Sequence, residues 1–203
     1  MAARPPAPTA NGSPTRRDEI LAVAAKVFAS RGIAASTVRD IADEAGILSG
    51  SLYHHFASKD QMVVEVLLPV IEEQQARYIE ASKQIDDPVE LVRRFIHIGV
   101  DGVARSPHTA RIMHNESVQF QTNEPLLVVH ETRQVTRRLW VSVLKRGARA
   151  GVFRKDLDAD VAVRAIFDTV YSSARWLPPR GRSSTTKIAT QLSQLFLDGL
   201  KAD

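Results

Sequence analysis

Residues 41–56, IADEAGILSGSLYHHF, have the pattern of two short helices joined at a glycine. Ala42 places a small side chain on the inner face of the first helix, one turn before Gly46. A glycine at that position adopts positive φ without a steric penalty. Two helices joined by such a short turn define a helix-turn-helix. The residues expected in the apolar seam between them are Ile41, Ala45, Ile47 and Leu52.

The segment before this motif predicts a helix that packs against it. The helix begins near Thr15 and ends at Gly32, where we expect a left-handed cap. Phe56, at the end of the motif, is expected to complete a small core against the apolar stripe of this first helix. That stripe consists of Ile20, Ala24, Val27 and Phe28.

The motif itself divides at Gly46. Its first helix is expected to begin at Ser36 or Thr37. Its second helix is expected to begin with Ser49 as N-cap and to run to Phe56. A long fourth helix follows, with the capping-box spacing of Ser58 and Gln61 at its start, and is long enough to join two domains.

The rest of the chain is also helical in pattern, with no convincing strand. Residues 106–120 are expected to form one helix, and we expect about nine helices in all. The predicted fold class is therefore all-α, with a three-helix helix-turn-helix domain at residues 15–60. A larger helical bundle is expected at residues 61–203. Residues 1–14, rich in Ala and Pro, are expected to be a disordered arm.

Composition sets broad limits on the class of protein. The 203 residues include no cysteine, so disulfides and thiolate metal sites are excluded. No apolar run approaches the length of a membrane span, and the N-terminus lacks the apolar core of a signal peptide. The net charge of +4 is compatible with nucleic acid but does not require it. We expect a cytoplasmic protein.

Several side chains around the second helix of the motif suit contact with DNA. Ser49, Gly50 and Ser51 are small, and Tyr53 and His54 have polar tips that reach phosphates or base edges. The fragment LYHHF alone is more typical of an ordinary amphipathic helix, but the alanine, glycine, caps and seam in register favour the helix-turn-helix. The expected DNA-contacting residues are Thr37, Arg39, Ser49, Gly50, Ser51, Tyr53, His54 and Lys59.

Residues 37–62, TVRDIADEAGILSGSLYHHFASKDQM, closely resemble the DNA-binding signature of the TetR family of bacterial one-component regulators. The resemblance covers about residues 15–65. It implies nine or ten helices, a homodimer, a variable ligand domain and, usually, repression. The positions that usually face DNA in the family match Thr37, Ser51, Tyr53, His54 and Lys59. The stretch GILSGSLYHHFASK is most similar to actinobacterial regulators of sterol-ring catabolism, which implies an acyl-CoA thioester as a possible effector.

The bundle is expected to enclose an effector pocket and to dimerise. Most of the candidate pocket residues named below also have the helical spacing of ordinary hydrophobic-core residues, so the sequence does not distinguish the two roles. The last two expected helices, 158–176 and 184–200, carry apolar stripes that two copies would bury together. A basic run at residues 137–149 is either a solvated face or the entrance of a pocket for an acidic ligand. The candidate pocket residues are Phe95, Ile98, Met113, Phe120, Trp140, Tyr171, Arg175 and Trp176.

No pattern in the sequence indicates catalysis. Phosphate-binding loops and nucleophile elbows are missing, and the histidines lack ligand spacing, so we expect no metal, no cofactor and no enzyme activity. The expected function is a ligand-responsive repressor on a palindromic double-stranded operator. Two alternatives stay open: an all-helical small-molecule carrier or enzyme with an incidental helix-turn-helix, and a regulator that answers to a protein partner.

Overall fold

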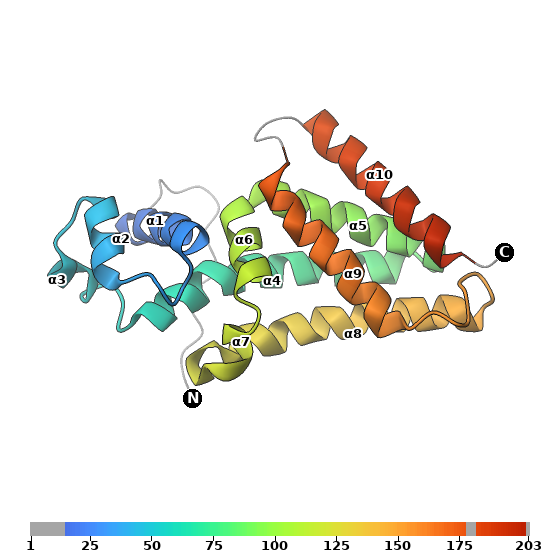
Figure 1. Ribbon diagram of the computed structural model, residues 1–203, viewed down its shortest axis with the longest axis horizontal. Helices are drawn as coiled ribbons and strands as arrows, with labels where there is room; N and C mark the ends of the chain where they lie inside the picture. Colours follow the sequence, from blue (N-terminus) through green and yellow to red (C-terminus); the bar gives the residue numbers. More distant parts are fainter. Residues whose placement is uncertain (1–14, 178–181, 202–203) are drawn as a thin grey trace.

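The computed structural model describes residues 15–177 and 182–201, and in these residues it contains helices and no strand. In Figure 1 α1–α3 form one end of an elongated molecule, and α4 extends from them into a bundle made by the later helices. The expected all-α architecture is confirmed. The helices are α1 Arg16–Arg31, α2 Val38–Ala45, α3 Ser49–Leu52, α4 Lys59–Gln84, α5 Pro88–Arg105, α6 Pro107–Asn115, α7 Gln119–Thr122, α8 Leu127–Arg149, α9 Ala159–Ser172 and α10 Arg182–Leu200, with 3-10 helices η1 Glu124–Leu126 and η2 Ser173–Arg175.

The number of α-helices in the described residues is ten rather than about nine, because residues 106–120 are not one helix. The segment breaks at Glu116, which caps the end of α6. The carboxylate of Glu116 accepts a hydrogen bond from the backbone N–H of Ile33 (3.3 Å), and the chain then turns so that Phe120 is buried. A contact between segments distant in sequence therefore ends this helix.

Local capping explains the bounds of the first helices. Thr15 and Thr37 each form a capping box, with Asp18 and Asp40 respectively, and the Ser58 hydroxyl accepts from the N–H of Gln61. These three starts agree with the sequence prediction. The expected end of α2 is also confirmed, because its C-cap glycine is left-handed, with φ 66° and ψ 35°.

Three local predictions were wrong. Gly32 has positive φ but is extended (φ 84°, ψ 157°), and an added Cβ would lie 2.9 Å from Glu116 Oε1. Ser49 is not an N-cap, since Leu48 occupies that position and makes no side-chain cap bond. The helix α3 ends at Leu52 rather than Phe56 because the chain continues in tighter turns, in which the His54 N–H donates to Ser51 O.

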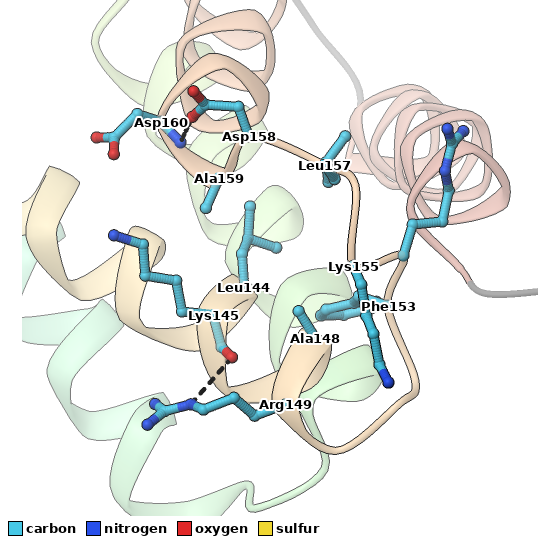
Figure 2. Close-up of a pocket in the computed structure, with 11 residues that line it drawn as sticks. Leu144, Lys145, Ala148, Arg149, Phe153, Lys155, Leu157, Asp158, Ala159 and Asp160 are labelled. Carbon is cyan, nitrogen blue, oxygen red and sulfur yellow. Dashed lines mark hydrogen bonds between the residues drawn. The ribbon is translucent and has the colours of Figure 1, made fainter.

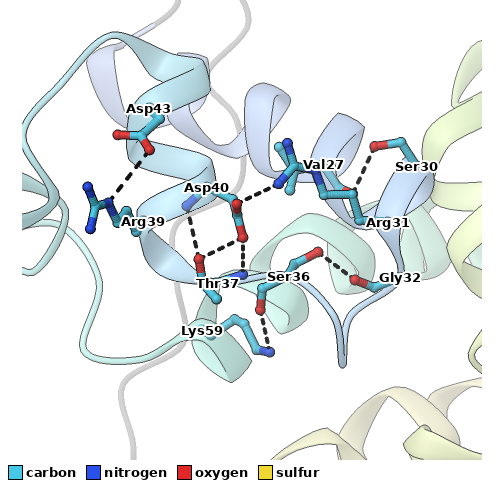
Figure 3. Close-up of polar contacts among 10 residues, drawn as sticks. All are labelled: Val27, Ser30, Arg31, Gly32, Ser36, Thr37, Arg39, Asp40, Asp43 and Lys59. Carbon is cyan, nitrogen blue, oxygen red and sulfur yellow. Dashed lines mark hydrogen bonds and ion pairs between the residues drawn. The ribbon is translucent and has the colours of Figure 1, made fainter.

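Side chains tie α1, α2 and α4 together around the loop between α1 and α2 (Figure 3). The Lys59 ammonium, at the start of α4, donates to the carbonyls of Ile33 (2.7 Å) and Ser36 (2.8 Å). Arg31 of α1 pairs with Asp40 of α2. The loop that leads into the helix-turn-helix is therefore held from both sides.

The hydrophobic core of α1–α3 is not confined to the N-terminal segment. Its buried members include Phe28, Ile41 and Phe56, and also Ile112 and Met113 of α6. It extends along α4 to Ile71 and reaches the start of α8, beyond the expected boundary near residue 60. A second core holds together the far half of α4 with α5, α8, α9 and α10. The helix-turn-helix and α6 consequently share one packed unit.

Substitution of Gly46 by alanine is expected to lower the free energy of unfolding by about 1–2 kcal/mol. An added Cβ meets no atom within 4 Å, so the penalty comes from the left-handed backbone alone. Gly50→Ala is the matched control, since that site is equally open and lacks positive φ. Urea denaturation of both variants measures the difference, and equal losses would contradict the assigned role of the left-handed backbone.

Lys59→Met is expected to lower the free energy of unfolding by about 1–3 kcal/mol, because two loop carbonyls lose a charged donor. Methionine retains an apolar stem of similar length. Lys26→Met is the control, since it removes only an exposed ion pair with Glu44 and is expected to cost less than about 1 kcal/mol. Thermal or urea denaturation that shows the same small effect for both variants would assign Lys59 no structural role.

Candidate nucleic-acid interface and effector cavities

The tip of the helix-turn-helix exposes side chains with apolar bodies. Leu48 is 80% exposed and Tyr53 is 61% exposed, while the intervening Leu52 is buried. Gly50, His54 and His55 are also exposed, and Ser49 and Ser51 are half-buried. Exposure of large apolar side chains to water is unfavourable. The exposed Leu48 and Tyr53 therefore suit contact with sugars, thymine methyl groups or base edges.

Two further predicted contacts lie at the start of α2. Thr37 is exposed, but its hydroxyl and its backbone N–H are both engaged with Asp40. These hydrogen bonds, with a smaller contribution from Arg31, hold the pKa of the Asp40 carboxyl below its usual value. Among the residues that the structure describes, Arg39 pairs only with Asp43, at a long 3.8 Å, and both side chains are largely exposed. Arg39 is therefore free to move to a phosphate.

Lys59 stands apart from the exposed candidates because its ammonium already contacts two loop carbonyls. The structure brings Ser49, Gly50, Ser51, Tyr53 and His54 together on the short α3 and the turn after it. Sequence reasoning overlooked Leu48. Its position directly before a predicted recognition helix was the available signal, but an isolated leucine in a helical pattern is more typical of core.

Arg17 was also overlooked, and it positions the turn after α3. Its guanidinium donates to His55 O (2.8 Å) and to Glu65 (2.7 Å). The same group lies 4.2 Å from the centroid of the Phe56 ring, at cation–π distance. Arg17 therefore connects α1, the recognition turn and α4, and it fixes the backbone that carries Tyr53 and His54.

An open cleft of about 670 Å³ lies at the end of the bundle far from α1–α3, between the end of α8 and the start of α9 (Figure 2). Lys145 and Arg149 of the predicted basic run line it, together with Lys155. Apolar side chains such as Leu144 and Phe153 also contribute to its wall. The carboxylates of Asp158 and Asp160 also line this open cleft, so its basic charge is partly offset. The cleft lies outside the core shared with the helix-turn-helix.

Three smaller cavities meet at the side chain of Tyr171. One lies between α4, α8 and α9, with room for about one water molecule. A second of the same size lies between α4, α5 and α6. The third, about 190 Å³, is lined by residues of α1, α6, α9 and η2, among them Arg111, His114 and Arg175. Tyr171 lines all three, and together these cavities border helices from the bundle to α1.

The predicted pocket residues occupy different environments. Tyr171 lines all three of these cavities, Met113 lines the one between α4, α5 and α6, and Arg175 lines the largest of the three. Trp176 is 53% exposed. The remaining four are fully or almost fully buried in packed core and line none of the cavities described above, namely Phe95, Ile98, Phe120 and Trp140.

A chain of aromatic contacts joins that core to the cavities. Trp140 packs edge-on against Phe167 (centroids 5.5 Å apart), and Phe167 packs edge-on against Tyr171 (6.1 Å). On its other side Trp140 contacts Phe95 (4.9 Å) and Tyr78 (5.8 Å). A displacement of the Tyr171 ring would therefore act on Phe167 and, through it, on Trp140 in the core.

The cavity between α4, α8 and α9 contains a cation that the sequence prediction did not include. Arg133 lies half-buried beside Tyr171 and over the edge of this cavity. Burial lowers the pKa of Arg133, and the nearby Tyr171 and Asp168 partly oppose this shift. Burial likewise raises the pKa of the Tyr171 hydroxyl, so it remains a neutral donor. Arg137, one turn after Arg133 on α8, instead forms an ion pair with Asp160.

The described residues contain neither a cluster of metal ligands nor a membrane-spanning helix. No three histidine, aspartate or glutamate side chains of residues 15–177 and 182–201 come together as metal ligands. None of the helices in these two ranges has the length and hydropathy that crossing a bilayer requires.

Comparison with known proteins identifies the family. The model for bacterial regulatory proteins of the tetR family matches residues 20–66, and the tetracyclin repressor-like C-terminal domain matches residues 85–200. The HTH-type transcriptional repressor KstR2 of Rhodococcus jostii (strain RHA1) is 38% identical over 97% of this chain and 96% of its own.

Solved structures agree with this assignment. The ketosteroid transcriptional regulator KstR2 of Mycobacterium tuberculosis superimposes with a TM-score of 0.84 at 36% identity, over 95% of this chain and 98% of its own. AibR, solved with isovaleryl coenzyme A and operator DNA, superimposes with a TM-score of 0.75 over 89% of this chain and 97% of its own, and at 21% identity shows the fold alone. The chain therefore belongs to the TetR family of bacterial regulatory proteins and is a transcriptional repressor similar to KstR2.

Proposed function

We propose that this repressor binds a palindromic operator as a cytoplasmic homodimer and leaves it when a small hydrophobic or acyl-CoA-type effector enters the cavities around Tyr171. The observation that carries the proposal is the shared core, in which Ile112 and Met113 of α6 pack with the helix-turn-helix. Met113 also lines a cavity bounded by Tyr171. A ligand that moves this wall necessarily disturbs the packing of the DNA-binding unit.

The DNA contacts proposed are those of the sequence prediction, with Leu48 added. Tyr53, His54 and Leu48 supply contacts to bases and sugars, while Arg39 supplies a mobile charge for phosphate. Lys59 has a structural role through its loop contacts, and its remaining donor is directed to phosphate. The other members of the set are Thr37, Ser49, Gly50 and Ser51.

The dimer interface proposed lies on α8 and α9. This proposal replaces α10, expected from the sequence in the seam, with α8. The helix α10 buries most of its stripe within its own chain, including Ala189, Leu197 and Leu200, and exposes only the single large apolar side chain of Leu195 among its described residues. By contrast, Val161 of α9 is 62% exposed, and Val128 and Val135 of α8 are exposed at a spacing of two turns. Two copies packed through these faces form an isologous four-helix interface, which sets two recognition helices on one side of the DNA.

Release is proposed as a population shift. An effector binds better to a conformation in which Tyr171 is displaced and α6 has moved relative to α1. The hydrogen bond from Ile33 to Glu116 and the packing of Met113 pass that movement to the helix-turn-helix. Operator affinity then falls by the ratio of the effector's affinities for the two conformations.

Two observations bear on the class of effector. AibR, which shares the fold, was solved with a coenzyme A thioester, and two relatives named KstR2 resemble this chain along its length. The thioester in AibR supports the acyl-CoA class, and the printed name of the M. tuberculosis relative, a ketosteroid transcriptional regulator, supports an apolar effector. An all-helical carrier is the second candidate, but exposure of Leu48 and Tyr53 on the helix-turn-helix favours DNA binding.

A homodimer at micromolar concentration is expected by size-exclusion chromatography with light scattering. Val161→Asp combined with Val135→Asp is expected to give monomers, because four charges would be buried in the proposed interface. Leu195→Asp is the control, since Leu195 is 68% exposed on α10, outside that interface. Dissociation by the control, or a double variant that stays dimeric, would place the interface elsewhere.

Operator binding tests the function itself. Fluorescence anisotropy on DNA from upstream of the gene and its neighbours is expected to show tight, salt-dependent binding to a palindrome, which acyl-CoA thioesters or small apolar ligands weaken. Arg39→Gln is expected to weaken binding and to reduce the salt dependence by about one counterion, because one phosphate contact is lost. Its stability is expected to stay unchanged, since the Arg39 pair is exposed.

Absence of specific binding to any of this DNA would contradict the choice of operator region, and ligand binding without any DNA binding would support the carrier. Tight binding that no thioester or apolar ligand weakens would contradict the effector class and leave the repressor.

A further inference from the structure

Leu48 is the most exposed of the large apolar side chains in the residues that the structure describes, at 80%. It lies directly before α3, the helix at the outer end of the molecule in Figure 1. Its position is the N-cap of that helix, where serine, threonine, asparagine or aspartate would supply a hydrogen bond that leucine does not. The fold therefore gives no reason for a leucine at this position.

The backbone that carries Leu48 is held in place on both sides. The N–H of Ile47 donates to Ala42 O (3.0 Å), and the carbonyl of Leu48 accepts from the N–H of Ser51 (2.9 Å). Ile47 itself packs against the core of the helix-turn-helix. A single exposed leucine is common on protein surfaces, but this one is directed outward from a fixed turn, so it is ready for a partner without reordering.

Gly50 is a second residue that the fold does not explain. It lies within α3 without positive φ, and an added Cβ would meet no atom within 4 Å. Alanine would fit there and would favour the helix. What glycine provides at an open position is a close approach of another molecule to the backbone. Leu48 and Gly50, on either side of Ser49, therefore both suit a partner at this surface rather than the fold itself.

The proposed function puts operator DNA at this surface. In the major groove the base edges present hydrogen-bond donors and acceptors, and the one large apolar group is the 5-methyl of thymine. A leucine side chain forms no hydrogen bond with a base or a phosphate, so within the groove it distinguishes bases by this methyl group. The exposed Arg39 nearby supplies charge for a phosphate, a contact that carries no sequence information.

We propose that Leu48 reads the 5-methyl group of one thymine in each half-site of the operator, and that Gly50 permits the close approach that this contact needs. The inference rests on the proposed function and deepens it, because it names a base of the operator and the chemical group by which that base is recognised. Burial of one methyl group against an aliphatic side chain changes affinity by about three- to tenfold per half-site.

Selection of binding sites by the full chain from a random duplex library begins the test, because selection does not depend on where the operator lies in the genome. The selected site is expected to contain a thymine at one fixed position of each half-site. Deoxyuridine then replaces thymine at one symmetric pair of positions at a time, which removes only the methyl groups. Fluorescence anisotropy is expected to show one pair whose replacement weakens wild-type binding by about ten- to a hundredfold.

Leu48→Ala completes a double-mutant cycle with that pair of operators. The variant is expected to bind the thymine operator about ten- to a hundredfold more weakly than the wild type and to bind both operators equally. Its melting temperature is expected to match the wild type, since the side chain is exposed and alanine caps a helix no better than leucine. Leu195→Ala is the matched control, because Leu195 is an exposed leucine on α10, and it is expected to keep the full thymine preference.

Gly50→Ala tests the close approach. It is expected to melt at or above the wild-type temperature, because its Cβ meets no atom of the described chain. It is also expected to weaken binding to the thymine operator by about tenfold, because the same Cβ would lie between α3 and the DNA. An unchanged operator affinity would contradict the role of Gly50.

Three outcomes would overturn the thymine contact while operator binding, and so the proposed function, stays intact. They are a wild type indifferent to every deoxyuridine pair, a thymine preference that Leu48→Ala retains, and a preference that Tyr53→Ala abolishes instead. A selected site with no thymine in either half-site would overturn it as well. Failure of the full chain to select any site would contradict the proposed function and the thymine contact together.

Discussion

The packing of α6 into the core of the helix-turn-helix couples the DNA-binding end of the molecule to the bundle. Ile112 and Met113 are almost fully buried among residues of α1–α4, and Glu116 at the end of α6 accepts a hydrogen bond from Ile33. Close-packed interiors transmit displacement because they contain few voids. In the described residues the helix-turn-helix therefore shares its core with α6, and a movement of α6 would disturb the packing beneath the recognition turn.

The same packing is the reason why we propose the cavities around Tyr171, and not the larger cleft at the far end, as the effector site. The cleft by Lys145 and Arg149 is roomy, but it borders only α8, α9 and their connecting loop. Of the smaller cavities, the 190 Å³ one borders both α1 and α6, and a second borders α6. Regulation of DNA binding needs a ligand that distinguishes two arrangements of those helices, and volume alone does not provide this.

Sequence reasoning predicted the features that arise from local chemistry. The capping boxes at Thr15 and Thr37, the left-handed Gly46 and the start of α9 at Asp158 follow from residues within a few positions of each other. It failed where distant segments decide the outcome. The break at Glu116 depends on a partner more than eighty positions away in the chain.

The candidate site divides in the same way. The exposed set on α3 and its turn was predictable, because the motif fixes which face is apolar. The cavity wall was not, because helical spacing does not distinguish a packed aromatic such as Trp140 from one beside a void such as Tyr171. Arg133 was missed since a single arginine in a basic helix is typical of a solvated face.

If the cavities and the recognition turns move together, the spacing of the two turns in the dimer must respond to the effector. The chain has no cysteine, so His55→Cys introduces one spin-label site per copy, at an exposed position. Pulsed electron paramagnetic resonance then measures the distance between the labels. We expect this distance to shift when bound effector is saturating. An unchanged distance, with binding confirmed by calorimetry, would contradict the coupling.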